Sequence, residues 1–181
     1  MIKKIVLAGF VMSVVLLLSV ANGAWDPRDK TATENKEVDE TISRFLKEDP
    51  SLKTFFDKAY GYVVFPTVSK GAYIVGVGYG KGLFFENAKP IGRASITQIS
   101  AGAQIGGQAF SEVIFFRDKE LAQEFKKGQF ELSAQASAVA VKEGVGKAGS
   151  YTNGIAIFIL PKGGLMAEAS IGGQRITFEP F

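Results

Sequence analysis

The 181-residue chain contains no cysteine and no histidine, and it has only six prolines. Without cysteine there can be no disulfide framework, no thiol nucleophile and no lipid anchor on a cysteine. Without histidine there is neither a serine–histidine–aspartate relay nor a histidine-based zinc site. Any enzyme would therefore depend on carboxylates, lysines or hydroxyls. The hydrophobic fraction of 46% is too high for a disordered chain, and the length suits one domain.

Residues 1–23 have the features of a secretory signal peptide. Two lysines supply a positive start, and an uncharged stretch runs from Ile5 to Val20. Small residues at 21–23 then precede a cut before Ala24. The alternative is an uncleaved anchor, because no charge appears until after Trp25 and that length just suffices to span a bilayer. We expect cleavage and a periplasmic or secreted protein, or an inner-membrane anchor if the segment is retained.

The rest of the chain is nearly neutral. The pI of about 9.0 overstates its basicity, since Lys3 and Lys4 lie in the signal segment. This balance argues against a nucleic-acid partner. Acidic residues are spread along the chain rather than clustered, so we expect no metal site.

Amphipathic patterning predicts a pair of helices over residues 33–60. Residues 24–32 are polar and are expected to form a mobile lead-in. From Thr33 to Lys47, apolar residues recur at helical spacing, and Asp49-Pro50 then ends this helix and opens the second. One further helix is expected over Asp118–Lys127, with Asp118 as its cap.

Beyond residue 60 the sequence changes to short runs of β-forming residues separated by glycine. The expected strands are Tyr62–Phe65, Ala72–Phe85, Ser95–Ile105, Ala109–Phe116, Ser133–Val141, Ile155–Leu160, Leu165–Ile171 and Gln174–Phe178. We therefore predict a single domain over residues 33–181 of the α+β, mainly β class. It should form a curved antiparallel sheet or incomplete barrel of about eight strands, with the helix pair packed on it.

Glycine is abundant, with 21 residues, and it is densest between Gly76 and Gly82. This run lacks the spacing of the dinucleotide fingerprint and of the phosphate-binding loop, so it predicts no nucleotide cofactor. Alternating glycines leave one face of a strand without side chains, which serves either sharp curvature or the floor of a groove for a lipid. A Gly-Gly pair also recurs at 106–107 and 172–173; a tight hairpin turn is expected there, with a glycine bulge as the alternative.

Candidate catalytic groups are few. Four carboxylates lie near apolar runs, namely Glu86, Glu112, Glu131 and Glu168. A glycosidase-like pair would need two of them to face each other, and solvated strand faces or ends explain each of them more simply. No nucleophile motif stands out. We predict no catalytic residue, no enzyme activity and no cofactor.

Lysines beside aromatic residues are more suggestive. Lysines can meet phosphate headgroups while aromatic rings enter a lipid interface. The alternative is a core of rings with the lysines kept in water. The candidate lipid-binding residues are Lys53, Lys58, Lys70, Lys81, Phe55, Phe56 and Tyr60.

Residues 58–82 read KAYGYVVFPTVSKGAYIVGVGYGKG and resemble the SYLF domain family. The segments QIGGQ at 104–108, VIFF at 113–116 and KGGL at 162–165 agree, and the resemblance extends over about 57–179. It implies lipid binding rather than catalysis. Eukaryotic members bind phosphoinositide membranes, some fungal members bind actin, and secreted bacterial members are described as lipid-binding.

The expected signal peptide argues against access to cytosolic actin. Binding of anionic phospholipid is the family property that carries over best. The expected function is therefore that of a phospholipid-binding protein of the cell envelope, with lysines on the headgroups and aromatic rings in the interface. The alternative is a structural or stress-response envelope protein that acts through contacts with other envelope proteins.

Overall fold

The computed structural model describes residues 27–72, 75–101, 106–128, 130–132, 138–140, 151–162 and 173–181. It divides the chain into two compact units, Met1–Ala32 and Thr33–Phe181. The predicted signal segment and the predicted strand Leu165–Ile171 lie outside the described residues. The second unit holds all of the described residues apart from the first turns of one helix.

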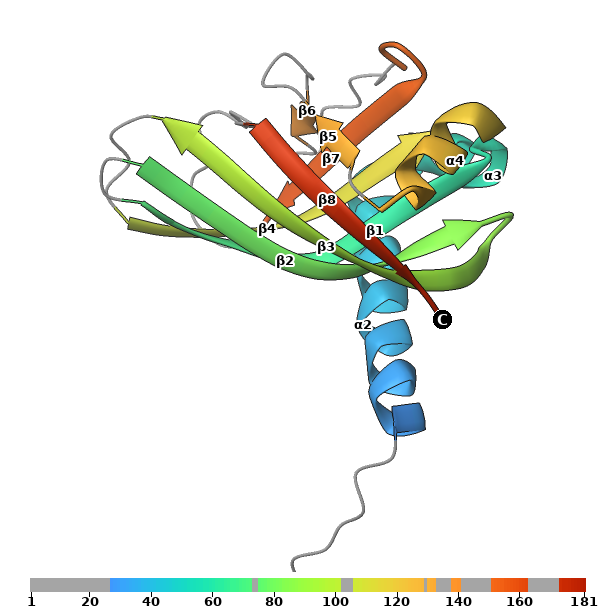
Figure 1. Ribbon diagram of the computed structural model, residues 1–181, viewed down its shortest axis with the longest axis horizontal. Helices are drawn as coiled ribbons and strands as arrows, with labels where there is room; N and C mark the ends of the chain where they lie inside the picture. Colours follow the sequence, from blue (N-terminus) through green and yellow to red (C-terminus); the bar gives the residue numbers. More distant parts are fainter. Residues whose placement is uncertain are drawn as a thin grey trace, which may run out of the picture. The chain divides into compact units, whose positions relative to one another are not determined.

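One eight-stranded sheet forms the second unit, in the order β5-β8-β3-β2-β1-β4-β7-β6. All described neighbours pair antiparallel except β6 and β7, which are parallel. The sheet curls into a half-barrel, which confirms the predicted curved, mainly β architecture (Figure 1). The strands are β1 Gly61–Ala72, β2 Val75–Glu86, β3 Lys89–Ala101, β4 Gly106–Phe116, β5 Phe130–Leu132, β6 Ala138–Ala140, β7 Ile155–Pro161 and β8 Gly173–Pro180.

The helices begin and end at residues with clear local reasons. Helix α2 (Pro27–Glu48) begins earlier than predicted, so the expected lead-in is helical from Pro27, a residue suited to a first helical turn. The Asp49 side chain caps the short 3-10 helix η1 (Pro50–Leu52), and α3 (Lys53–Lys58) follows directly. Helix α4 (Lys119–Lys126) is capped by Asp118, as predicted.

The sheet carries a hydrophobic cluster on each face. Alternate residues of β1 point to opposite sides, so Val63 packs with Phe125 of α4. Val64 packs on the other side with Phe45 of α2 and Leu52 of η1. We call the α4 side the concave face and the α2 side the convex face. The sheet is therefore covered on both faces, with α2, η1 and α3 on the convex one.

Several strand predictions need correction: β3 begins at Lys89 rather than Ser95, Ala72 ends β1 rather than opening the next strand, and β5 was not predicted. Pro66 does not end β1; the strand continues to Ala72 after an irregularity in the pairing between Val64 and Thr67. Proline lacks a backbone N–H, and a bulge accommodates that missing ladder bond. Gly106 and Gly107 do not form the predicted turn, because they pair with β1 in the ladder as the first residues of β4.

Candidate functional site

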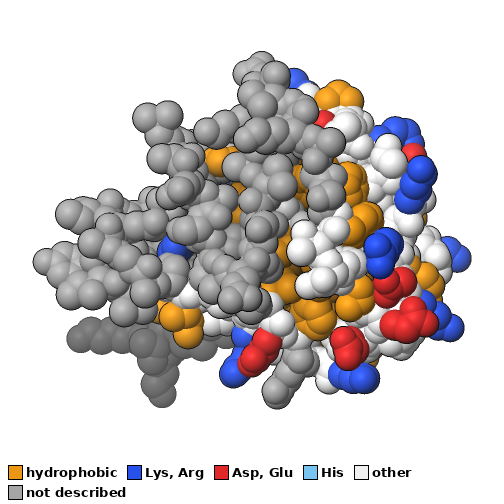
Figure 2. Space-filling view, turned by 90° about the horizontal axis from the view of Figure 1, so that it is seen from above, with side chains coloured by type: hydrophobic (Ala, Val, Ile, Leu, Met, Phe, Trp, Pro, Cys, Tyr) orange, Lys and Arg blue, Asp and Glu red, His pale blue; other side chains and the backbone are white. Residues whose placement is uncertain are grey.

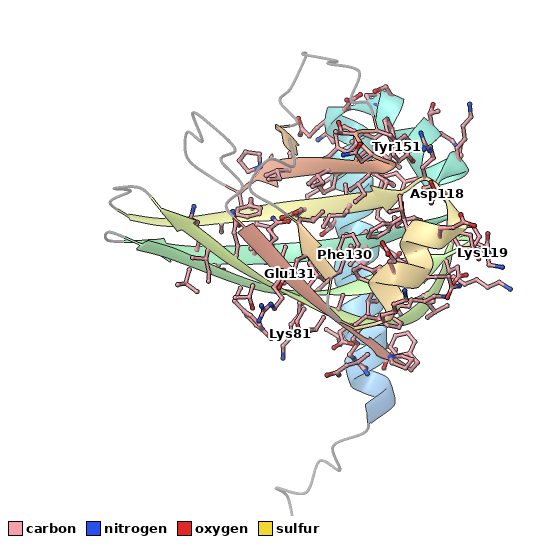
Figure 3. The ribbon with its side chains drawn as sticks, turned by 45° about the horizontal axis from the view of Figure 1, so that its top comes forward. Lys81, Asp118, Lys119, Phe130, Glu131 and Tyr151 are labelled. Atoms are coloured by element: carbon pink, nitrogen blue, oxygen red, sulfur yellow. The ribbon has the colours of Figure 1, made fainter. Side chains whose placement is uncertain are left out.

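The predicted lipid-binding lysines do not lie together. Lys53 and Lys58 are exposed on α3, and Lys53 forms an ion pair of 2.7 Å with Asp57. Lys70 is buried on the concave face of β1, whereas Lys81 is exposed on the convex face of β2. Lys81 points away from the interior of the half-barrel (Figure 3). These four side chains therefore do not form one cationic surface.

The predicted aromatic residues are packed into the protein. Phe55 lies 5.0 Å from Phe158 and 5.2 Å from Tyr151 between ring centroids, and Tyr151 is seen beside α3 in Figure 3. Phe56 packs in the same convex-face cluster. The Tyr60 hydroxyl donates a hydrogen bond of 2.6 Å to Glu86. These rings therefore pack against the core, as the alternative interpretation of them predicts.

An exposed apolar patch lies instead on the convex face of β2 and β3. Val77, Tyr79 and Ile99 are 54%, 50% and 59% exposed. Val77 is directly opposite Ile99 in the ladder, and Tyr79 is two residues further along the same face. We call these three residues the convex patch. In the same row stand Gly71 on β1 and Gly173 on β8, where an added Cβ would meet nothing within 4 Å.

Cationic side chains lie beside the convex patch. Lys81 is opposite Thr67 in the β1–β2 ladder, and the Lys162 ammonium donates a hydrogen bond of 2.5 Å to the Thr67 hydroxyl. Burial and the charge of Arg44 lower the pKa of Lys162, whereas Glu37 raises it. Lys81, Lys162 and Arg44 thus gather around one stretch of the convex face.

The sequence contained a signal for this patch, namely the alternation of glycine with larger residues along β2. A search for nucleotide-binding motifs does not use this alternation. Along β2 the glycines alternate with Val77, Tyr79 and Lys81, and a period of two places the two sets on opposite faces. A Cβ at Gly82 would lie 2.1 Å from the Val64 carbonyl oxygen, and one at Gly80 would lie 2.7 Å from the Thr67 oxygen. At these two positions glycine allows close backbone approach, as the curvature interpretation requires.

The candidate carboxylates have separate environments. Glu112 is fully buried, so its predicted solvation is wrong; its carboxyl accepts hydrogen bonds of 3.0 and 3.1 Å from the Gln174 amide, and burial raises its pKa to about 8. Hydrogen bonds from Lys126 and Tyr60 lower the pKa of Glu86. Glu131 is exposed and pairs with an arginine of β8 (Figure 3).

Glu168 lies outside the described residues. Each of the three described carboxylates has a different partner, so no facing acid–base pair is formed among them. Within the described ranges, no cluster of acidic residues is placed to hold a metal ion.

Seen from above, Lys, Arg, Asp and Glu side chains are interspersed along the described part of the surface (Figure 2). No helix among the described residues has the length and apolar character to cross a membrane.

Comparison with known proteins finds a partial relative. No family model matches the chain. It is 33% identical over 153 residues to Beta cell expansion factor A from Aeromonas veronii. The matched part is 81% of this chain and 58% of that protein, so the chain spans less than two thirds of its relative. The resemblance to the SYLF family stays a prediction.

Proposed function

We propose that the protein binds the surface of anionic phospholipid membranes in the cell envelope, through the convex patch and its neighbouring cations. The observation that carries the proposal is the exposure of Val77, Tyr79 and Ile99 side by side on a strand pair that also presents Lys81. A group of exposed apolar side chains rimmed by polar residues is typical of an interaction surface.

The chemistry of this surface suits a bilayer interface. Tyrosine and aliphatic side chains enter the boundary between headgroups and acyl chains, while lysines remain at the phosphates. Each lysine or arginine near an anionic surface contributes about 1 kcal/mol. Lys81, Lys162 and Arg44 would thus hold the protein reversibly, with Glu37 opposing them.

The backbone around the patch also favours a flat partner. Gly71 and Gly173 carry no side chain on either side of Val77 and Ile99, so these two side chains project beyond their row. A membrane can approach them without meeting a neighbouring Cβ. The proposed lipid contact therefore moves from the rings of α3 to β2 and β3, and of the residues predicted from sequence it keeps Lys81.

The test is co-sedimentation with vesicles of phosphatidylcholine alone and with added phosphatidylglycerol. We expect the protein to bind the anionic vesicles, and Lys81→Glu/Lys162→Glu to weaken binding at least tenfold because attraction becomes repulsion. Tyr79→Ser/Ile99→Ser should weaken it at both low and high salt.

The matched control is Lys89→Glu/Lys119→Glu, which makes the same change in charge at exposed positions elsewhere. Equal sedimentation of all variants would rule out the convex patch. Loss of binding in Lys53→Glu/Lys58→Glu alone would return the site to α3. If the wild-type protein does not bind vesicles but captures an envelope protein in pull-down experiments, the result supports the alternative function through contacts with other envelope proteins.

A further inference from the structure

A row of polar side chains crosses the concave face of the sheet, opposite the convex patch. Lys70 of β1 is the ladder partner of Gly78 of β2, which in turn pairs with Gln98 of β3. Gln98 pairs with Gln174 of β8. The Gln174 amide nitrogen then reaches the Glu112 carboxyl of β4 across the half-barrel. One polar row thus connects five strands.

All members of this row lie on the concave face. The row continues across Gly78, because Lys70 and Gln98 lie on either side of it. A Cβ at Gly78 would lie 3.3 Å from the Gln98 Cβ and 3.7 Å from the Lys70 Cβ. It would also lie 3.5 Å from the Gln98 amide oxygen, so this oxygen lies over Gly78. A Cβ at this position would crowd the Gln98 side chain, so glycine allows Lys70 and Gln98 to lie close to each other across β2.

These side chains are buried but incompletely paired. Lys70 is 5% exposed, and Gln98 and Gln174 are 2% exposed. The side-chain oxygens of both glutamines are buried and accept no hydrogen bond from the described part of the chain. Buried polar atoms are nearly always paired in folded proteins, and each exception calls for a partner. Two neighbouring acceptors without donors therefore indicate a ligand that donates.

The charge of the row favours an anion. Burial raises the pKa of Glu112 to about 8 and so disfavours a charge on this carboxyl, whose hydrogen bonds are to Gln174 and not to Lys70. Burial lowers the pKa of Lys70, and no described residue forms an ion pair with it. A complementary ligand thus brings negative charge for Lys70 and hydrogen-bond donors for the two amide oxygens. The two glutamines are ladder partners, and the Cβ atoms of such a pair are typically about 5 Å apart.

We propose that Lys70, Gln98 and Gln174 bind a phosphate ester that carries hydroxyl groups, of the glycerol phosphate type. The phosphate lies at the Lys70 ammonium, and the hydroxyls donate to the two glutamine oxygens. The ester can be a free metabolite or the headgroup of phosphatidylglycerol. This site is separate from the proposed membrane contact, because it faces the opposite side of the sheet.

Isothermal titration calorimetry with four probes tests the site: sn-glycerol 3-phosphate, monomeric dihexanoylphosphatidylglycerol, glycerol and inorganic phosphate. We expect one of the two esters to bind at least tenfold more tightly than glycerol or phosphate alone. Tighter binding of the lipid would identify a headgroup, and tighter binding of glycerol phosphate would identify a free ester. If neither ester binds wild type, the proposal is wrong.

Two substitutions locate the binding. Lys70→Met should lower ester affinity at least tenfold. Gln98→Leu should do so at least fivefold, while the ligand-free protein keeps or raises its melting temperature because an unpaired buried acceptor is removed. Ester affinity equal to wild type in both variants would overturn the assignment.

The controls are Lys89→Met and Gln123→Leu, which make the same changes at exposed positions. The convex-face variant Lys81→Glu/Lys162→Glu should keep its ester affinity. Loss of vesicle binding with intact ester binding, or the reverse, therefore distinguishes a failure of the proposed function from a failure of this site.

Discussion

The carboxyl of Glu112 lies in the interior of the half-barrel, and its burial couples folding to pH. Its pKa of about 8 is well above the 4.5 of an exposed glutamic acid, because the charged form loses its hydration. Between these values the folded state holds a proton that the unfolded chain has released. Stability therefore falls as pH rises from about 4.5 to 8, by about 1 kcal/mol for each pH unit.

Glu112→Gln should remove this pH dependence, since an amide does not titrate. Urea unfolding at pH 5, 6.5 and 8 should show wild type losing several kcal/mol across the series and the variant losing much less. The lowered pKa of Glu86 acts in more acidic solution, where its stabilisation is lost as pH falls. Glu131→Gln, on an exposed side chain, is the control, and an unchanged slope in Glu112→Gln would contradict this coupling.

The role of single residues was the part least accessible to sequence. Glu112 is bonded to a glutamine 62 residues later, and no local pattern relates those two positions. Phe55 and Phe56 followed a helical stripe that fits a core and an interface equally well. Lys81 and Tyr79 were recognisable as neighbours, but their exposure depends on where α2 covers the sheet.

At the scale of elements, glycines on opposite faces of the sheet differ in how well they tolerate an added side chain. A Cβ at Gly82 would meet the backbone of β1 at 2.1 Å, whereas a Cβ at Gly71 on that neighbouring strand would meet nothing within 4 Å. Gly82→Ala should therefore cost about 2 kcal/mol or more, because the strands must separate.

Gly71→Ala is the matched control and should change stability by less than about 0.5 kcal/mol. Guanidinium unfolding of the two variants gives the comparison. Equal stabilities would show that the inner face of β2 has room for a side chain, and would contradict the role of Gly82 in the close approach to β1.

The periodic elements could be predicted, and the boundaries mostly could not. Spacing of apolar residues gave helix α4 and the existence of β1 to β4, because burial on one face enforces a period. Pro66 was expected to end a strand, but tertiary pairing carries β1 past it with a bulge. Gly106 and Gly107 lie in a ladder because β1 supplies their partners, which the local sequence does not contain.

At the scale of the whole second unit, the two hydrophobic clusters share their strands. Residues of β1, β2, β4 and β7 enter both clusters, one from each face. Loss of packing on one face therefore weakens the sheet that supports the other. We expect this unit to unfold in a single transition.

Leu52→Ala on the convex side and Phe125→Ala on the concave side should each lower stability by about 2–5 kcal/mol. Far-UV and near-UV circular dichroism should give coincident denaturation curves for both variants. A curve that separates into two steps in either variant would show that the faces unfold independently.

The alternation along β2 also limits how this strand can pair during folding. A slip of one position would turn Tyr79 and Lys81 toward the interior at the places of Gly80 and Gly82, where the backbone of β1 leaves almost no room. Steric clash thus opposes the misaligned pairing, so this glycine-rich strand specifies its own alignment.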